Sequence, residues 1–241
     1  DFQPGDRVFG CADGAFADYA VAASKRLAHL PAGVSFEHAS TLGTAARTAL
    51  QALRAAGIEG PGSGAGRSVL VIGAAGGVGS FAVQLAALAG ATVTGVCSTA
   101  KLDFVRGLGA TEVVDYTKGP VTGRFDVVVD IAGARSIGEG KQLLTDRGTL
   151  VIVGGEGGGA LLGPSSRMMA APFASLFSKQ KVLGIFQTER RDDLEALAEL
   201  VATGALVPAV EQTLPLEHAP QAIAHLAAGR ALGKTVLSIT T

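Results

Sequence analysis

Residues 69–86 read VLVIGAAGGVGSFAVQLA. Four apolar residues lead into a turn whose glycines are three residues apart, Gly73, Gly76 and Gly79. The apolar residues before the turn favour a strand, and the longer apolar stretch after it favours a helix. In a strand–turn–helix unit, glycine lets the chain turn tightly, approach a pyrophosphate and pack helix against strand. Although the spacing is G-x-x-G-x-x-G rather than G-x-G-x-x-G, we predict that this turn binds a dinucleotide.

The stretch around this turn is long enough to raise the question of a membrane span. Residues 68–100 contain no charged residue. Glycines interrupt the stretch, however, Gln84 lies in its middle, and both ends are rich in β-branched residues. Parallel strands that are buried on both faces are also continuously apolar. We therefore predict two strands around one helix and no membrane span.

Strand and helix signals alternate along the rest of the central sequence. The predicted strands are 69–72, 92–97, 112–114, 126–130, 149–153 and 182–186. The predicted helices are 78–89, 101–108, 136–144 and 191–202. This alternation predicts an α/β fold in which a doubly wound parallel Rossmann sheet carries helices on both faces.

The two ends of the chain do not follow this alternation. Residues 1–40 have the pattern of short strands and turns, and residues 205–241 combine two strand-like stretches with one helix. We expect the two ends to form a second structural unit. The predicted domains are a β-rich segment at 1–40, a cofactor-binding domain at 41–188 and a return segment at 189–241.

Composition excludes several classes of protein. The net charge is −1 over 241 residues, so there is no electrostatic signature of a nucleic-acid or anionic-membrane partner. Two cysteines, Cys11 and Cys97, are too few for a disulfide framework or a four-cysteine zinc site. A reducing, cytoplasmic location is the expectation.

The end of the second predicted strand indicates which dinucleotide is bound. An acidic residue there would accept hydrogen bonds from the ribose 2′-hydroxyl of NAD. The sequence has no acid at this point and reads Cys97-Ser98-Thr99-Ala100-Lys101 instead. Hydroxyls and a lysine suit a 2′-phosphate, because they form charge-assisted hydrogen bonds. The predicted cofactor is therefore NADP(H).

The glycine turn and the segments around it resemble the medium-chain dehydrogenase/reductase superfamily, in its zinc-independent, quinone-oxidoreductase-like branch. The resemblance covers nearly the whole chain. It is carried by DFQPGDRVFG, GAFADYAVAA, TLGTAARTALQAL, GAAGGVGSFAVQLAALAGATVTGVCSTAKLDFVRGLGATEVVDY, GTLVIVGG and GRALGKTVLSI. It implies that residues 1–40 are the last part of a chaperonin-10-like catalytic domain. Because the match begins partway through that domain, we expect the chain to be truncated at its N-terminus.

The resemblance also implies roles for individual residues. Thr48 matches a threonine beside the nicotinamide and is the candidate catalytic residue. The implied cofactor-binding residues are Gly73, Gly76, Gly77, Val78 and Gly79 at the pyrophosphate turn, Ser98, Lys101 and Tyr116 at the 2′-phosphate, Gly154 and Gly155 at the nicotinamide, and Lys234 near the pyrophosphate.

The linking segment departs from the family pattern. Gly43 and Arg47 stand where the family usually has a proline and an apolar residue. Thr44 stands where the zinc-dependent relatives have a cysteine ligand, and the four histidines show no ligand spacing. Since thiolates are missing, we predict no metal.

Two other enzyme classes lack their signatures. Neither tyrosine, Tyr19 or Tyr116, is followed four residues later by lysine, as a short-chain dehydrogenase requires, and no G-x-S-x-G hydrolase motif occurs. The resemblance implies an NADPH-dependent oxidoreductase that transfers hydride to a quinone, enone or other conjugated carbonyl. A zinc-free NADP-dependent alcohol dehydrogenase and a largely non-catalytic, redox-responsive NADPH-binding protein stay open. We expect a homodimer joined at the edge of the sixth strand.

Overall fold

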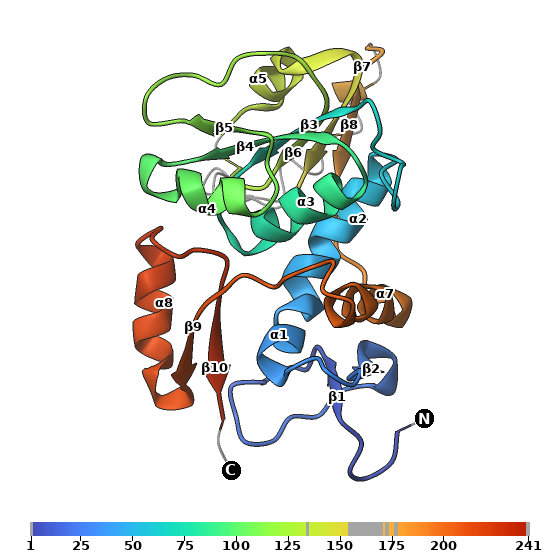
Figure 1. The fold of residues 1–241 in the computed structure, drawn as a ribbon, viewed down its shortest axis with the longest axis vertical. Helices are drawn as coiled ribbons and strands as arrows, with labels where there is room; N and C mark the ends of the chain where they lie inside the picture. The colour runs from blue at the N-terminus through green and yellow to red at the C-terminus, as the bar shows by residue number, and fades with distance from the viewer. Residues whose placement is uncertain (1, 134, 154–170, 172–173, 176–177, 240–241) are drawn as a thin grey trace. The chain divides into compact units, whose positions relative to one another are not determined.

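The computed structural model describes residues 2–133, 135–153, 171, 174–175 and 178–239 (Figure 1). The chain forms two compact units, which we call the terminal unit (Asp1–Arg47 with Gln187–Thr241) and the central unit (Thr48–Phe186). The predicted glycine turn belongs to the central unit. The predicted domain limits at 41 and 188 stay a prediction.

The central unit contains a six-stranded sheet in which every pair of neighbouring strands is parallel. The strand order is β5-β4-β3-β6-β7-β8, the 3-2-1-4-5-6 order of a Rossmann fold. The strands are β3 (Ser68–Ile72), β4 (Thr92–Cys97), β5 (Glu112–Asp115), β6 (Phe125–Asp130), β7 (Leu144–Ile152) and β8 (Lys181–Gly184). The predicted α/β fold with a doubly wound parallel sheet is therefore confirmed.

The inner strands are apolar because both of their faces are buried. Leu70 and Ile72 of β3 join a core cluster with Val128 of β6 and Leu150 of β7. Val71, which points to the opposite face of the sheet, is also fully buried. The uncharged stretch that could have suggested a membrane span thus forms two covered strands and the helix between them.

Helices pack on both faces of this sheet, and Figure 1 draws α3 and α4 below it and α5 above. The bounds are α3 (Gly77–Leu88), η3 (Thr99–Lys101), α4 (Leu102–Gly107) and α5 (Ile137–Gln142). A capping box between Ser136 and Glu139 begins α5. The prediction that this helix reaches residue 144 is wrong, because Leu144 begins β7 and pairs with Phe125.

β8 is an edge strand of the sheet, as the predicted dimer contact requires. Its outer side is partly covered, because the backbone N–H of Val182 donates to Ser175 Oγ at 2.8 Å. Just after β8 ends, Ile185 N–H donates to Ile152 C=O of β7 at 3.0 Å, so the chain stays beside β7 there. Part of the edge available for pairing with another chain is therefore already used.

The terminal unit is built from the two ends of the chain. Its strands β1 and β2 are antiparallel, and β9 and β10 are parallel. Its elements are β1 (Val8–Gly10), η1 (Ser24–Arg26), β2 (Leu27–His29), α1 (Phe36–Ser40), η2 (Leu42–Ala46), α7 (Arg191–Ala202), β9 (Val210–Pro215), η4 (Leu216–His218), α8 (Ala219–Ala227) and β10 (Lys234–Ser238). Helix α2 (Arg47–Ala55) begins at the last residue of its first segment.

Candidate functional site

The glycine turn lies between β3 and the first turn of α3. Gly73 has a φ of +87°, which favours glycine, and its N–H donates to Val96 C=O on the neighbouring strand at 3.2 Å. Gly76 is the N-cap of α3, and no side chain caps the helix there. The N–H of Ser80 makes the first helical bond, to Gly76 C=O, so the three N–H groups before it have no partner within the helix.

Two glycines of the turn serve different purposes. A Cβ added at Gly79 would lie 2.1 Å from Gly73 C=O, so Gly79 is needed for the helix to pack closely against the turn. A Cβ at Gly76 would meet only Gly73 C=O, at 3.5 Å, which is an ordinary contact. Gly76, Gly77 and Val78 are half-buried, so the start of α3 is accessible and can hold an anion.

The ends of β4 and β5 lie side by side. Tyr116 N–H donates to Cys97 C=O at 3.2 Å, which joins the residues that follow the two strands. Ser98 and Lys101 are half-buried, and the Tyr116 side chain is 57% exposed. The structure therefore brings together the residues that the sequence predicted for the 2′-phosphate.

An acid that the sequence reasoning missed lies at the same place. Asp115 ends β5, and its carboxylate accepts hydrogen bonds from Thr99 Oγ1 at 2.5 Å and from the N–H and hydroxyl of Thr117 at 2.9 and 2.7 Å. Lys118 Nζ lies 4.0 Å from it. The hydrogen bonds from Thr99 and then Thr117 hold the pKa of Asp115 below its ordinary value. The sequence reasoning considered only the end of the second strand, whereas this acid follows the third.

The other predicted site residues belong to other elements of the chain or lie outside the described residues. Thr48, on α2, is 9% exposed. Lys234 begins β10 in the terminal unit, where burial lowers the pKa of its ammonium group. Gly154 and Gly155 lie outside the described residues.

The linking segment contains an unusual helical turn. Residues Leu42–Ala46 form a π-helix, and the N–H of Arg47 donates to Leu42 C=O, five residues back. Such wide turns are frequent at functional sites. Thr44 Oγ1 lies 3.9 Å from Cys11 Sγ, but no group of three or more potential metal ligands exists among the described residues.

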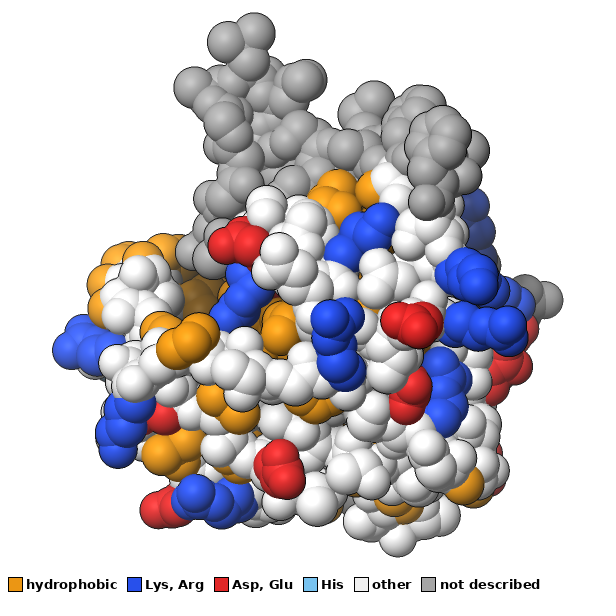
Figure 2. Space-filling view, turned by 90° about the horizontal axis from the view of Figure 1, so that it is seen from above, with side chains coloured by type: hydrophobic (Ala, Val, Ile, Leu, Met, Phe, Trp, Pro, Cys, Tyr) orange, Lys and Arg blue, Asp and Glu red, His pale blue; other side chains and the backbone are white. Residues whose placement is uncertain are grey.

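One face of the described part of the molecule mixes positive and negative side chains. On the face drawn in Figure 2, Lys and Arg side chains are interspersed with Asp and Glu side chains. Within the described part of the chain, no helix combines the length and the apolar character that crossing a membrane requires.

Comparison with known proteins identifies the family. Residues 108–237 match the family model of zinc-binding dehydrogenases. A chloroplast envelope quinone oxidoreductase homolog of Arabidopsis thaliana is 32% identical over 98% of this chain and 74% of its own length. The chain belongs to the medium-chain dehydrogenase/reductase superfamily, a family of oxidoreductases, as its sequence motifs predicted.

Solved structures agree with this assignment. The quinone oxidoreductase from Coxiella burnetii superposes with a TM-score of 0.84 at 26% identity, covering 100% of this chain and 74% of that one. An NAD-dependent alcohol dehydrogenase superposes with a TM-score of 0.77 at 32% identity, covering 94% of this chain and 66% of that one.

Proposed function

We propose that the protein is an NADPH-dependent oxidoreductase that reduces a quinone, enone or other conjugated carbonyl. The observation that carries the proposal is the accessible start of α3, which no side chain caps, behind a turn that requires glycine at positions 73 and 79. The backbone N–H groups of Gly77, Val78 and Gly79 fit the pyrophosphate of a dinucleotide. Quinone reduction is supported by the names of two of the similar proteins.

The preference for NADPH rests on the charges at the ends of β4 and β5. Lys101 follows Ser98 in the turn after β4, and Lys118 Nζ lies 4.0 Å from Asp115, an anion whose oxygens already accept hydrogen bonds from two threonines. A 2′-phosphate gains charge-assisted hydrogen bonds from the lysines, which a ribose hydroxyl cannot match. Because its pKa is lowered, Asp115 is ionised at neutral pH. Its carboxylate therefore repels a 2′-phosphate and reduces the preference for NADPH over NADH.

Titration of the purified protein with NADPH and NADH tests this preference. Lys101→Glu is expected to weaken NADPH binding on the order of tenfold or more and to leave NADH binding nearly unchanged, because one attractive charge becomes repulsive. Lys25→Glu makes the same charge change at an exposed residue of η1 and serves as the control. If Lys101→Glu leaves NADPH affinity unchanged, the assignment of NADPH is wrong.

The chemical step needs few protein groups. The nicotinamide supplies hydride when the cofactor is bound, and the protein orients it and excludes water. Thr48 is the proposed donor to the carbonyl oxygen on which negative charge develops. We expect Thr48→Val to lower kcat more than it raises KM, measured with 1,2-naphthoquinone; an unchanged kcat removes Thr48 from the mechanism.

Zinc independence is part of the proposal. Thr44 stands at the position of the cysteine ligand in the zinc-dependent relatives, and a hydroxyl is a poor substitute for a thiolate. Activity is therefore expected to survive dialysis against 1,10-phenanthroline. Loss of activity that added zinc restores would contradict this.

A zinc-free alcohol dehydrogenase is the second candidate, favoured by the similarity to an NAD-dependent alcohol dehydrogenase. Oxidation of simple alcohols with NADP⁺ or NAD⁺ in the absence of quinone reduction would select it. Tight NADPH binding without turnover of either substrate class would instead select a non-catalytic, redox-responsive role.

The predicted homodimer and cytoplasmic location stay proposals. The bond between Ser175 and Val182 leaves less of the β8 edge for a partner chain than the sequence suggested. Analytical ultracentrifugation of the full chain tests the dimer.

A further inference from the structure

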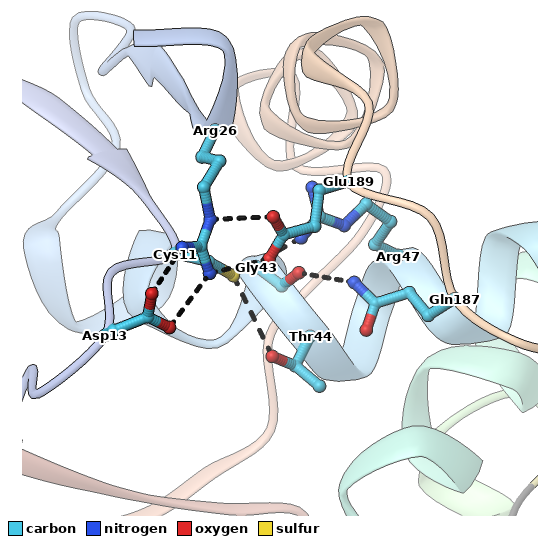
Figure 3. Close-up of polar contacts among 8 residues, drawn as sticks. All are labelled: Cys11, Asp13, Arg26, Gly43, Thr44, Arg47, Gln187 and Glu189. Carbon is cyan, nitrogen blue, oxygen red and sulfur yellow. Dashed lines mark hydrogen bonds and ion pairs between the residues drawn. The ribbon is translucent and has the colours of Figure 1, made fainter. Parts of the chain in front are cut away.

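A cluster of polar side chains in the terminal unit has no part in the proposed cofactor site. Figure 3 shows it: Arg47, at the start of α2, reaches toward Cys11, and Thr44 approaches the same sulfur from η2. The cluster also contains Arg26, which pairs with two acids, Asp13 and Glu189.

Arg47 is a buried cation, and no ion pair joins it to an acid among the described residues. Its side chain is 0% exposed, and its guanidinium donates a hydrogen bond from Nη2 to Cys11 Sγ at 3.3 Å. Within the described residues, Nε and Nη1 have no hydrogen-bond partner. Burying an unpaired charge is costly, so such a group indicates an anion that is present in some state of the protein.

The neighbouring ion pairs do not supply that anion. Asp13 Oδ2 lies 3.0 Å from Arg26 Nη1, and Glu189 Oε2 lies 2.7 Å from Arg26 Nε, although that N–H is not aligned for a hydrogen bond. Asp13 and then Glu189 raise the pKa of Arg26, which shows that both acids act on this other cation. The sulfur of Cys11 is the atom that receives the hydrogen bond of Arg47.

Cys11 is placed between the buried cation and the surface. Its side chain is half-buried, and Thr44, 3.9 Å from its sulfur, is exposed. Gly43 makes room for it, because a Cβ there would lie 2.8 Å from Cys11 Sγ. Gln187 Nε2 donates to Gly43 C=O at 3.1 Å and holds this turn. The two departures from the family pattern, Gly43 and Arg47, therefore both serve Cys11.

We propose that Cys11 is a covalent modification site whose sulfur adds to α,β-unsaturated carbonyl compounds. The guanidinium of Arg47 contacts the sulfur, with Nη2 at 3.3 Å, and the anionic form of sulfur is the nucleophilic form of cysteine. The sulfur forms a bond to the β-carbon, the electron pair of the C=C bond moves to the carbonyl oxygen, and the enolate takes a proton from water at the α-carbon. The thiol proton has gone to solvent, so the net change is addition of S–H across the double bond.

The electrophile belongs to the same chemical class as the proposed substrate, but the addition requires no nicotinamide. The two proposals therefore fail separately: a protein that reduces quinones without labelling at Cys11 refutes this one alone, and labelling without turnover refutes the other.

The test is alkylation of the full chain, without added cofactor, by N-ethylmaleimide and by methyl vinyl ketone. Peptide mass mapping gives the rate at Cys11 and at Cys97, whose buried thiol has a pKa raised by desolvation and serves as the internal control. We expect Cys11 to react on the order of tenfold or more faster than Cys97 at pH 7. Equal rates, or faster reaction at Cys97, would overturn the proposal.

Variants separate the effect of Arg47 from simple exposure. Arg47→Met is expected to slow alkylation of Cys11 on the order of tenfold, and Arg47→Lys is expected to slow it less. Lys25→Met removes an exposed charge of η1 and is expected to leave the rate of alkylation unchanged. If Arg47→Met does not fold, the native chain is compared with the urea-unfolded chain, in which Cys11 is expected to react more slowly. A rate at Cys11 that is independent of Arg47, or unchanged by unfolding, refutes the proposal.

Discussion

Arg47 is the largest fully buried side chain of the described residues, and it is charged. A buried ion that lacks good partners usually destabilises the fold compared with an apolar side chain of similar volume. The presence of a charge at this position is explained if the guanidinium acts on the sulfur of Cys11. The same feature makes a prediction about stability.

Replacing Arg47 by methionine is expected to raise the free energy of unfolding by about 1–3 kcal/mol, since it removes an uncompensated buried charge and keeps most of the volume. Urea denaturation followed by circular dichroism measures the change. Arg47→Lys, which keeps the charge, is the control and is not expected to stabilise. A clear loss of stability in Arg47→Met would mean that the guanidinium has a stronger partner than the Cys11 sulfur.

Gly76 and Gly79 allow binding and folding to be separated at the glycine turn. Gly79→Ala is expected to cost about 1–3 kcal/mol of stability, because its Cβ would meet backbone atoms at 2.1 Å. Gly76→Ala has room for its Cβ and is expected to fold, yet to weaken NADPH binding where the pyrophosphate approaches the backbone. Thermal unfolding and cofactor titration measure the two effects; a Gly76→Ala protein with unchanged affinity would place the cofactor elsewhere.

At the scale of residues, the features that depend on neighbouring residues in the chain could be predicted from the sequence. The glycines could be assigned because each of their roles is set by the strand and helix on either side. Asp115 was missed because its importance depends on β5 lying next to β4, which is a long-range pairing. Arg47 differs from the apolar residue that the family usually has at this position, which the sequence alone shows. Its burial beside Cys11 could be learned only from the folded chain.

At the scale of elements, the amino ends of three strands are joined through one carboxylate. Asp126 of β6 accepts hydrogen bonds from the N–H and hydroxyl of Ser68 on β3, both at 2.9 Å, and from the hydroxyl of Thr145 on β7 at 3.2 Å. The N–H of Ser68 is the largest cause that lowers the pKa of Asp126 from its ordinary value of 3.8. The ionised form is therefore the one that the folded sheet favours.

This lowered pKa makes stability depend on pH in a definite direction. The contribution of Asp126 is fully present above pH 3.8 and is lost as the pH falls through the lower pKa of the folded state. Asp126→Asn is expected to cost about 1–2 kcal/mol at pH 7 and progressively less in strong acid. Urea unfolding at several pH values measures this. A cost that is the same at pH 7 and pH 2.5 would show that ionisation of Asp126 does not matter.

The order of strands and helices was predictable, because apolar runs and glycine stops mark each element. The boundary between α5 and β7 was not, since residues 143–144 are apolar and suit either element. Leu144 pairs with Phe125, next to an irregularity in the β6–β7 register, and this pairing places Leu144 in strand β7. Tertiary contact overrides local preference at this point.

At the scale of the whole molecule, the glycine turn belongs to the central unit. A ligand that binds the folded state stabilises it by about 2.7 kcal/mol at a concentration 100 times its Kd. NADPH at that level is expected to slow amide hydrogen exchange in residues 68–97 by up to about a hundredfold, and to slow it less in residues 191–202 and 210–238.

Hydrogen exchange followed by mass spectrometry measures both units in one sample. NADP⁺ and NADH serve as comparison ligands. They show whether the slowing of exchange is specific to NADPH or is caused by any nicotinamide nucleotide. Equal slowing in both units would contradict the prediction, because it would mean that they open together as one cooperative body.

The split terminal unit also has a consequence for how the protein is made. Arg26 and Leu27 bond to Glu189 and Arg191, which the ribosome adds much later. At about 5–20 residues per second, the early segment waits many seconds with the apolar residues around Ala28 uncovered. The contiguous central unit can fold in that interval. We therefore expect the terminal unit to form only after residues 187–239 have been synthesised, and residues 2–47 to be more accessible to chaperones and proteases before that point.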